Sequence, residues 1–162
     1  MTAPLDLDDL RQGLLDKLRV VLHIHEPEAD SNKDSFIVDA HKYVLKATIS
    51  EAEVSYTFEL KQPINGLRLG IFSIADYAPF IGDPDLEKAA LSVYHELMNL
   101  IDTIHNREIY VGKQSSKGAY IAWQDIDKYK LKLCKKTFFG GLMSTESSID
   151  KEELQKLNLE RI

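Results

Sequence analysis

The sequence is poor in the residues that build disulfide-rich, fibrous or disordered proteins. Its 162 residues include one cysteine, five prolines and eight glycines. Because Cys134 is alone, it cannot form a disulfide within the chain, and the N-terminus has neither the basic nor the apolar segment of a signal peptide. Hydrophobic residues make up 44% of the chain and charged residues 28%, as in ordinary globular proteins. We therefore expect a protein of the cytoplasm.

Long apolar runs and an excess of positive charge are also missing. A membrane helix needs about 20 apolar residues, and charged residues interrupt every candidate segment of this sequence. The chain has 20 basic and 26 acidic residues, which gives a net charge of −6. This balance argues against nucleic-acid binding, which depends on cations that neutralise phosphates. An acidic surface instead suits a basic protein partner, and no membrane contact is expected.

The common catalytic signatures are absent as well. The sequence contains no G-x-S-x-G nucleophile elbow, no G-x-x-x-x-G-K-[ST] phosphate loop and no G-x-G-x-x-G motif. The segment "HELMN" has Asn99 where the zinc-protease pattern H-E-x-x-H has its second histidine. Since an active site needs convergent polar groups, we expect a protein without enzymatic activity and without a cofactor.

Helical periodicity is present in three segments. Leucines recur at helical spacing from Leu7, and this helix can continue to His25, because Pro27 disfavours helical geometry only at the residue before it. A second, longer helix is predicted over residues 84–104, with Asp83 as its N-cap and Pro84 at its first position. A third, short helix is predicted over residues 148–159.

Alternation with a period of two predicts the strands. Residues 43–49 and 54–60 alternate, and a tight turn at Asn65-Gly66 leads into a third alternating segment at 67–71. Residues 35–41 fit a helix or a strand equally well. Three further strands are predicted later in the chain, at residues 107–112, 119–124 and 128–136. The chain is thus predicted to be one α+β domain, residues 1–162, with an antiparallel sheet of five to six strands (a meander plus a later hairpin) packed by the N-terminal and central helices.

The order helix, three strands, helix, strands, helix resembles the arrangement of type III secretion chaperones, which are also small and acidic. The resemblance implies a protein that holds a client on an exposed sheet or on a homodimer face. It is carried by element order alone, because no motif accompanies it.

The stretch "LHIHEPEAD" raises the question of a metal site. His23 and His25 would share one face if they lay on a strand, but they diverge by roughly 200° on a helix. A metal-dependent hydrolase could be assembled from these histidines, His41 and either Asp39 or Glu26, provided that residues 21–25 and 37–41 form neighbouring strands. The unbroken leucine pattern favours the helix, so we expect no metal.

The stretch "KYKLKLCKK" concentrates positive charge. Lys128, Lys130 and Lys132 alternate with Tyr129, Leu131 and Leu133, and two more lysines, Lys135 and Lys136, follow. Such a basic stripe could bind an anionic ligand, RNA or an acidic partner. The alternative is that the lysines protect an exposed edge strand against aggregation.

Aromatic residues follow the basic stripe. Phe138 and Phe139, with Leu142 and Met143, surround two glycines and would form an interaction patch if exposed, although paired aromatics more often fill the core. Taken together, these features predict a non-enzymatic protein-binding domain that occupies a partner's surface, as inhibitors, immunity proteins and antitoxins do. The metal-dependent hydrolase and the secretion-type chaperone, which would form a homodimer, are the alternatives.

Overall fold

The structure is a computed structural model that describes residues 6–24, 28–29, 34–76, 84–137 and 141–162. It confirms the α+β class, with three helices and two antiparallel sheets. The chain divides into two compact units. The first comprises Met1–Glu59 and Ile71–Ile101, and the second comprises Leu60–Gly70 and Asp102–Ile162. The single domain expected from the chain length stays a prediction.

The sheet of the first unit is a meander in which each strand pairs with the next one along the chain. Its strands are β1 (Glu28–Ala29), β2 (Ser35–Asp39), β3 (Tyr43–Ile49), β4 (Glu53–Leu60) and β5 (Gly70–Asp76). Alternation decides which side chains enter the core. Leu45, Ala47 and Ile49 of β3 are buried, and so are the alternate residues of β4, whereas Lys46 between them is exposed. One face of the sheet is therefore apolar and must be covered.

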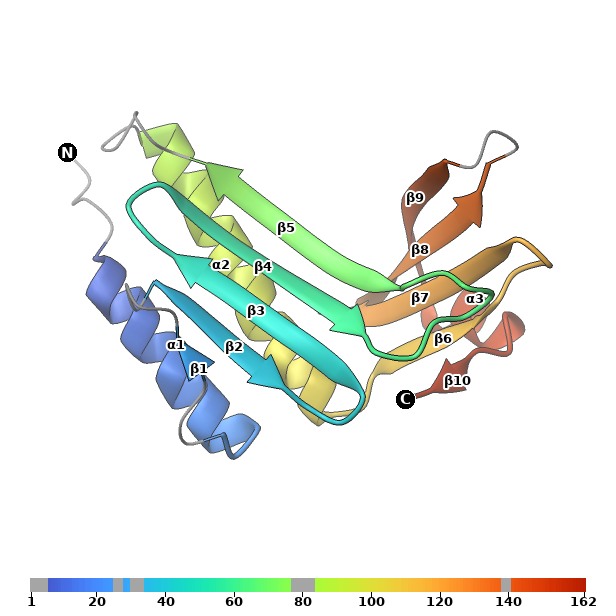
Figure 1. Ribbon diagram of the computed structural model, residues 1–162, viewed down its shortest axis with the longest axis horizontal. Helices are drawn as coiled ribbons and strands as arrows, with labels where there is room; N and C mark the ends of the chain where they lie inside the picture. The colour runs from blue at the N-terminus through green and yellow to red at the C-terminus, as the bar shows by residue number, and fades with distance from the viewer. Residues whose placement is uncertain (1–5, 25–27, 30–33, 77–83, 138–140) are drawn as a thin grey trace. The chain divides into compact units, whose positions relative to one another are not determined.

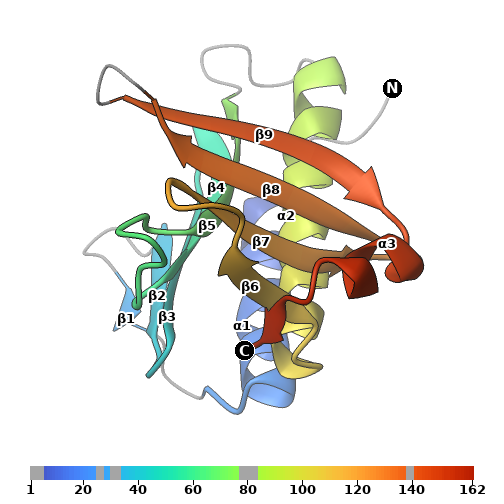
Figure 2. The same cartoon turned by 90° about the vertical axis from the view of Figure 1, so that its right-hand side faces the viewer.

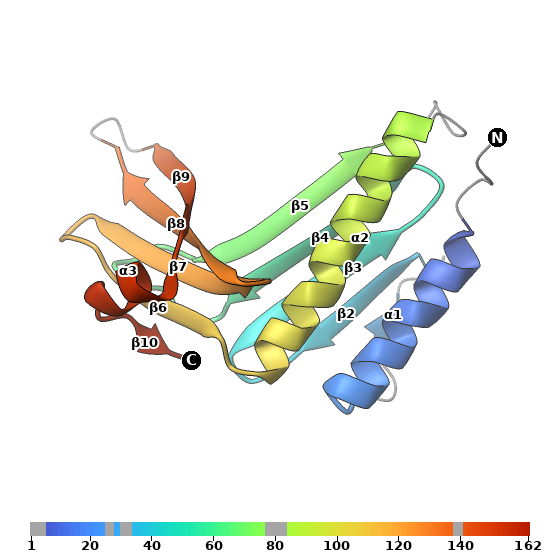
Figure 3. The same cartoon turned by 180° about the vertical axis from the view of Figure 1, so that it is seen from behind.

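Two helices cover that face. Helix α1 (Leu7–Val21) and helix α2 (Pro84–His105) lie on the same side of the sheet, as Figures 1 and 3 show. The side chain of Asp6 caps α1 by accepting a hydrogen bond from the backbone N–H of Asp9 at 3.2 Å. Leu14 and Leu18 are the buried residues of α1, and the central apolar stripe of α2 is buried too: Ala90, Val93, Leu97, Leu100 and Ile101.

A glycine lets the two helices approach each other. A Cβ added at Gly13 of α1 would meet the hydroxyl oxygen of Tyr94, which comes from α2. Glycine disfavours a helix interior by roughly 1 kcal/mol relative to alanine. A side chain at position 13 would require the Tyr94 hydroxyl to shift.

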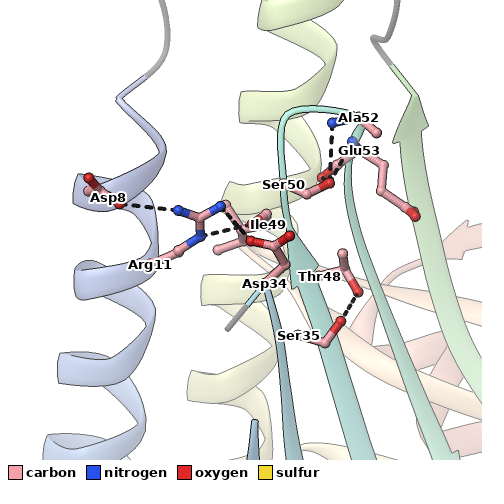
Figure 4. A network of polar contacts seen from close by, with 9 residues as sticks. All are labelled: Asp8, Arg11, Asp34, Ser35, Thr48, Ile49, Ser50, Ala52 and Glu53. Carbon is pink, nitrogen blue, oxygen red and sulfur yellow. Dashed lines mark hydrogen bonds and ion pairs between the residues drawn. The ribbon is translucent and has the colours of Figure 1, made fainter. Parts of the chain in front are cut away.

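One arginine fastens α1 to the sheet (Figure 4). The Arg11 guanidinium donates from Nε to the carbonyl oxygen of Ile49 at 2.9 Å, and from Nη2 to Oδ1 of Asp34 at 2.8 Å. Its third nitrogen, Nη1, lies 3.1 Å from Oδ1 of Asp8 on the same helix. The carbonyl of Ile49 belongs to the end of β3, so this contact sets where α1 sits along the sheet.

The second unit contains the other sheet and a short helix. Its elements are β6 (Ile109–Lys113), β7 (Gly118–Asp125), β8 (Lys128–Lys136), β9 (Leu142–Ile149), α3 (Lys151–Lys156) and β10 (Glu160–Arg161), and the strands lie in the order β10-β6-β7-β8-β9. Figure 2 shows this sheet with α3 lying over one of its faces. There Leu154 of α3 forms a core with Ala122, Tyr129 and Ile149 from three strands.

The connection between β4 and β5 belongs to the second unit. Asn65 and Gly66 both have positive φ angles, 53° and 73°, which confirms the predicted tight turn. The Asn65 side chain donates from Nδ2 to the carbonyl oxygens of Ser115 and Gly118, at 2.6 and 2.8 Å. The turn is thus attached to the β6–β7 hairpin, which local sequence did not reveal.

Most predicted elements are confirmed, but some details differ. The third strand of the meander runs over Gly70–Asp76 and not over 67–71. Residues 35–39 form a strand. Helix α1 ends at Val21, with Leu22 as its C-cap, so the prediction that it reaches His25 was wrong. The last helix is shorter than predicted, because residues 142–149 form β9, which the sequence did not predict. The proposed N-cap, Asp83, lies outside the described residues.

None of the helices in the described ranges is both long and apolar enough to cross a membrane.

Replacing Arg11 tests its role as a fastener of α1. Arg11→Ala is expected to lower the free energy of unfolding by about 1–3 kcal/mol, because the carbonyl of Ile49 and the carboxylate of Asp34 lose a charged donor. Arg19→Ala, an exposed position on the same helix, is the control and should change stability by less than about 0.5 kcal/mol. Urea unfolding measures both, and equal effects would contradict the assigned role.

Candidate functional site

The proposed histidine site does not have the strands that it requires. His23 follows the end of α1 with a φ of 59°, and residues 21–24 are not a strand. The strand β2 pairs with β1 and β3 instead, with Ile37 opposite Glu28 and Lys46. His25 and Glu26 lie outside the described residues, while Asp39 and His41 are exposed. Within the described part of the chain, no three acidic, histidine or cysteine side chains are grouped to hold a metal.

The basic stripe lies in the interior of a sheet. β8 pairs with β7 from Lys128 to Lys135 and with β9 from Tyr129 to Lys136. The interpretation of these lysines as protection for an edge strand was therefore wrong, because β8 has a neighbour on each side. A central strand with lysines needs another explanation, since a central strand has no open edge to protect.

The lysines divide between the two faces of the sheet. The alternation places Lys128, Lys130, Lys132 and Lys136 on one face, which we call the lysine face, and Lys135 on the other, the face that α3 covers. Tyr129, only 7% exposed, is on the α3 face. The alternation predicted for the stripe is confirmed, but it excludes Lys135 from a common surface with the other four lysines.

Two residues of the lysine face are held by contacts within the second unit. Lys130 Nζ lies 3.6 Å from Oε1 of Glu146 on β9, and Lys132 donates from Nζ to the carbonyl oxygen of Gly70 at 3.1 Å. The Lys130 pair is partly exposed, and such pairs contribute at most about 1 kcal/mol. Residues 128–149 carry five lysines and a single glutamate, and Asp125 of β7 lies opposite Lys128.

The strand β9 next to the stripe forms the outer edge of this sheet. Its first seven residues are exposed, and Leu142 and Met143 are 75% and 52% exposed. For these two residues the interpretation as core was wrong, and the interpretation as an interaction patch is the one that fits. Phe138 and Phe139, assigned to the same patch, lie outside the described residues.

The edge of β9 has little of the usual protection, since Glu146 is its one charged residue. Its pairing with β8 runs without a bulge from Leu142 to Ile149, and the strand contains neither lysine nor proline. In the described residues no further strand pairs with its outer side, so its backbone N–H and C=O groups on that side can pair with an added strand. We call this feature the β9 edge.

A cluster of hydrogen-bonding side chains on the α3 face was missed by the sequence reasoning. Tyr110 and Tyr129 both donate from their hydroxyls to Oε2 of Glu108, at 2.8 and 3.0 Å. Arg161 donates from Nη2 to Oε1 of Glu108 at 3.0 Å and to the Tyr110 hydroxyl at 2.7 Å. The only sequence signal was Glu108 and Tyr110 two residues apart, and their partners come from β8 and β10, distant along the chain.

This cluster changes the acidity of Tyr129. Burial, followed by the hydrogen bond to Glu108 and the charge of that carboxylate, raises the pKa of Tyr129 to about 12. Burial also raises the pKa of Tyr110, an effect opposed by the hydrogen bond from Arg161. Both hydroxyls therefore stay protonated at neutral pH, and they act here as hydrogen-bond donors rather than as bases.

Comparisons with known proteins gave no match. No protein-family model matches the chain, no curated protein matches its sequence, and no solved structure matches its fold at a significant level.

The acidity of Tyr129 can be tested by titration. One tyrosine is expected to ionise near pH 12 instead of near 10, and Tyr129→Phe should remove that step. Because the folded state holds this proton more tightly than the unfolded chain, the stability gained from Tyr129 is present below pH 10 and is lost as the pH rises through about 12. The tyrosinate absorbance and the unfolding free energy measure the two effects.

Two variants that each remove one carboxylate charge test the cause of this pKa shift, and one of them serves as the control. Glu108→Gln should lower the pKa of Tyr129, because the neutral amide no longer repels the tyrosinate. Glu152→Gln removes an exposed carboxylate of α3 and should leave the titration unchanged. Identical curves for the two variants would show that Glu108 does not determine the acidity of Tyr129.

Proposed function

We propose that this chain is a non-enzymatic, cytoplasmic protein-binding domain, of the kind represented by inhibitors, immunity proteins and antitoxins. It binds by taking an acidic, extended segment of its partner as an additional strand along the β9 edge. The observation that carries this proposal is an outer strand of eight residues, seven of them exposed, with no lysine, proline or bulge to prevent pairing.

The other outer strands of the described sheets give the comparison. β1 and β10 have two residues each, too short to serve as a template, and short edges are one way in which proteins avoid unwanted pairing. The remaining outer strand, β5, has seven residues and exposes Phe72 and Ile74, so it is a second long edge. β9 differs from β5 in having a lysine-rich strand, β8, as its neighbour. β9 is four times as long as β1 or β10 and begins with the exposed Leu142 and Met143. An edge of that length that stays open is a hazard for a soluble protein unless a partner uses it, so we assign it to binding.

Local charge defines the partner segment. Residues 128–149 carry a net charge of +4, although the whole chain carries −6. The net charge of the whole chain suggested a basic partner. Salt screens electrostatic interactions beyond about 8–10 Å at physiological ionic strength. The charge beside the β9 edge therefore decides which segment can lie there. The surface at the β9 edge is basic, and the segment that it binds is acidic.

Side-chain size on β9 allows a lysine to reach that segment. On the lysine face, β9 presents Ser144, Glu146 and Ser148 between β8 and the added strand. An added strand would lie about 10 Å from β8, because neighbouring strands are about 4.8 Å apart. Lys130 lies opposite the small Ser148, so its extended side chain has room to cross β9 and meet a carboxylate of the added strand. Lys132 lies opposite Glu146 and is held by the carbonyl oxygen of Gly70.

Paired binding experiments test this function. The wild-type protein, Leu142→Asp/Met143→Asp and the control Val20→Asp would each be used to capture partners from a lysate of the source organism. Val20 is an apolar residue, 71% exposed, on α1. We expect one partner that the wild type and Val20→Asp retain. The double variant should bind it at least about tenfold more weakly, because it loses apolar contact and adds repulsion to an acidic segment.

Two further measurements use that partner after purification. Its affinity should fall as salt rises, and the backbone amides of β9 that exchange rapidly in the free protein should become protected in the complex. Equal binding by the double variant, or unchanged exchange of β9, would show that the β9 edge is not the surface used. A wild-type homodimer with protected β9 amides would show instead that the occupant is a second copy, as in the chaperone alternative.

A further inference from the structure

The second unit has a half-open cleft between α3 and the strands β6, β8 and β10. Its volume is about 460 Å³, within the range of about 300–1,000 Å³ that is usual for small-molecule sites. The rings of Tyr110 and Tyr129 and the side chains of Leu154 and Leu159 supply its apolar lining. The two rings meet edge to face, with centroids 6.0 Å apart. All the lining residues belong to the second unit, on the α3 face of its sheet.

The polar side chains of the cleft include donors whose hydrogens are not used by the described part of the chain. Lys151, Gln155 and Asn158 line the cleft, and none of these side chains has a hydrogen bond or ion pair with any described residue. Arg161 donates from Nε and Nη2 to Tyr110 and Glu108. Its remaining nitrogen, Nη1, has no acceptor in the part of the chain that the structure describes. Four side chains therefore offer hydrogen atoms to a ligand.

The charge of the cleft is positive. Lys151 and Arg161 line it, and no acidic side chain does. The nearest carboxylate of the cluster, Glu108, already accepts hydrogen bonds from Tyr110, Tyr129 and Arg161, so both of its oxygens are occupied. Because Arg161 is paired with Glu108, the positive charge that remains uncompensated in the lining is that of Lys151, and it favours an anion over a cation.

Arg161 is held in place before any ligand arrives. Its guanidinium carbon lies 5.4 Å from the centroid of the Tyr110 ring, and Glu108 and the Tyr110 hydroxyl fix two of its nitrogens. An arginine fixed in this way loses little side-chain entropy when it binds a carboxylate, so more of the interaction energy appears as affinity. The contacts of Glu108 thus position Arg161 for a ligand.

We infer that this cleft binds a small organic anion: a carboxylate attached to a flat apolar body of about one or two rings. The carboxylate receives hydrogen bonds from Arg161 Nη1 and Lys151, and the apolar body lies against the tyrosine rings and the two leucines. This site is separate from the β9 edge, whose side chains are not among those that line the cleft.

A matched pair of ligands tests the inference. Indole-3-acetate and indole-3-acetamide have the same ring and differ in charge. Backbone amide NMR shifts would be followed during titration of the full chain. We expect indole-3-acetate to bind with a Kd of about 1 mM, as befits a ligand of this size, and to shift signals of the cleft residues. The amide should bind about tenfold more weakly, because it lacks the charge that Arg161 recognises.

Variants then assign the charge contacts. Arg161→Gln should weaken indole-3-acetate binding about tenfold, and Lys151→Gln, which removes an exposed charge, about threefold. Lys156→Gln, on the same helix but outside the cleft lining, is the control and should leave the Kd unchanged. If Arg161→Gln detaches β10 from the sheet, the Kd of the Lys151→Gln variant decides the outcome. Equal binding of acid and amide, no shifts of cleft signals, or equal effects of Lys151→Gln and Lys156→Gln would overturn the inference.

Discussion

The pairing of β8 on both of its sides is the constraint from which the surfaces of the second unit follow. With β7 and β9 as neighbours along nearly its whole length, β8 cannot rotate or slip by one residue without reversing every side chain. Its register places Lys128, Lys130 and Lys132 on one face and Tyr129 on the other. The same eight-residue pairing makes β9, and not β8, the outer strand of the sheet.

Both proposed surfaces depend on this one strand. Tyr129 enters the α3 face, where it donates to Glu108 and lines the cleft, while the lysines on the opposite face give the β9 edge its positive charge. The two surfaces use different chemistry. At the β9 edge, backbone groups would provide affinity and lysines would select for acidic residues. In the cleft, side chains alone supply the recognition, with Glu108 holding Arg161 in position.

Local patterns predicted the elements whose ends have local causes. The alternation in 43–49 and 54–60 predicted two strands because one face of each is buried, and Asn65-Gly66 predicted a turn because both residues adopt positive φ. The predicted end of α1 was wrong because no helix-breaking residue stands between Val21 and Pro27. The helix ends at Val21, and His23 takes a left-handed conformation that the sequence pattern does not indicate. β9 was missed because "STESS" has no apolar face, and an exposed strand produces no hydrophobic period.

The sequence by itself determined the α+β class, the positions of most strands and the segregation of charge into the stripe at 128–136, because each follows from spacings of a few residues. Only the tertiary structure decided what those residues face. Whether a lysine strand is central or outer depends on β9, and whether Glu108 meets Tyr129 and Arg161 depends on strands far apart in the chain. Periodicity reports which side chains share a face, but strand order and long-range contacts are properties of the folded chain, so they carry no local signal.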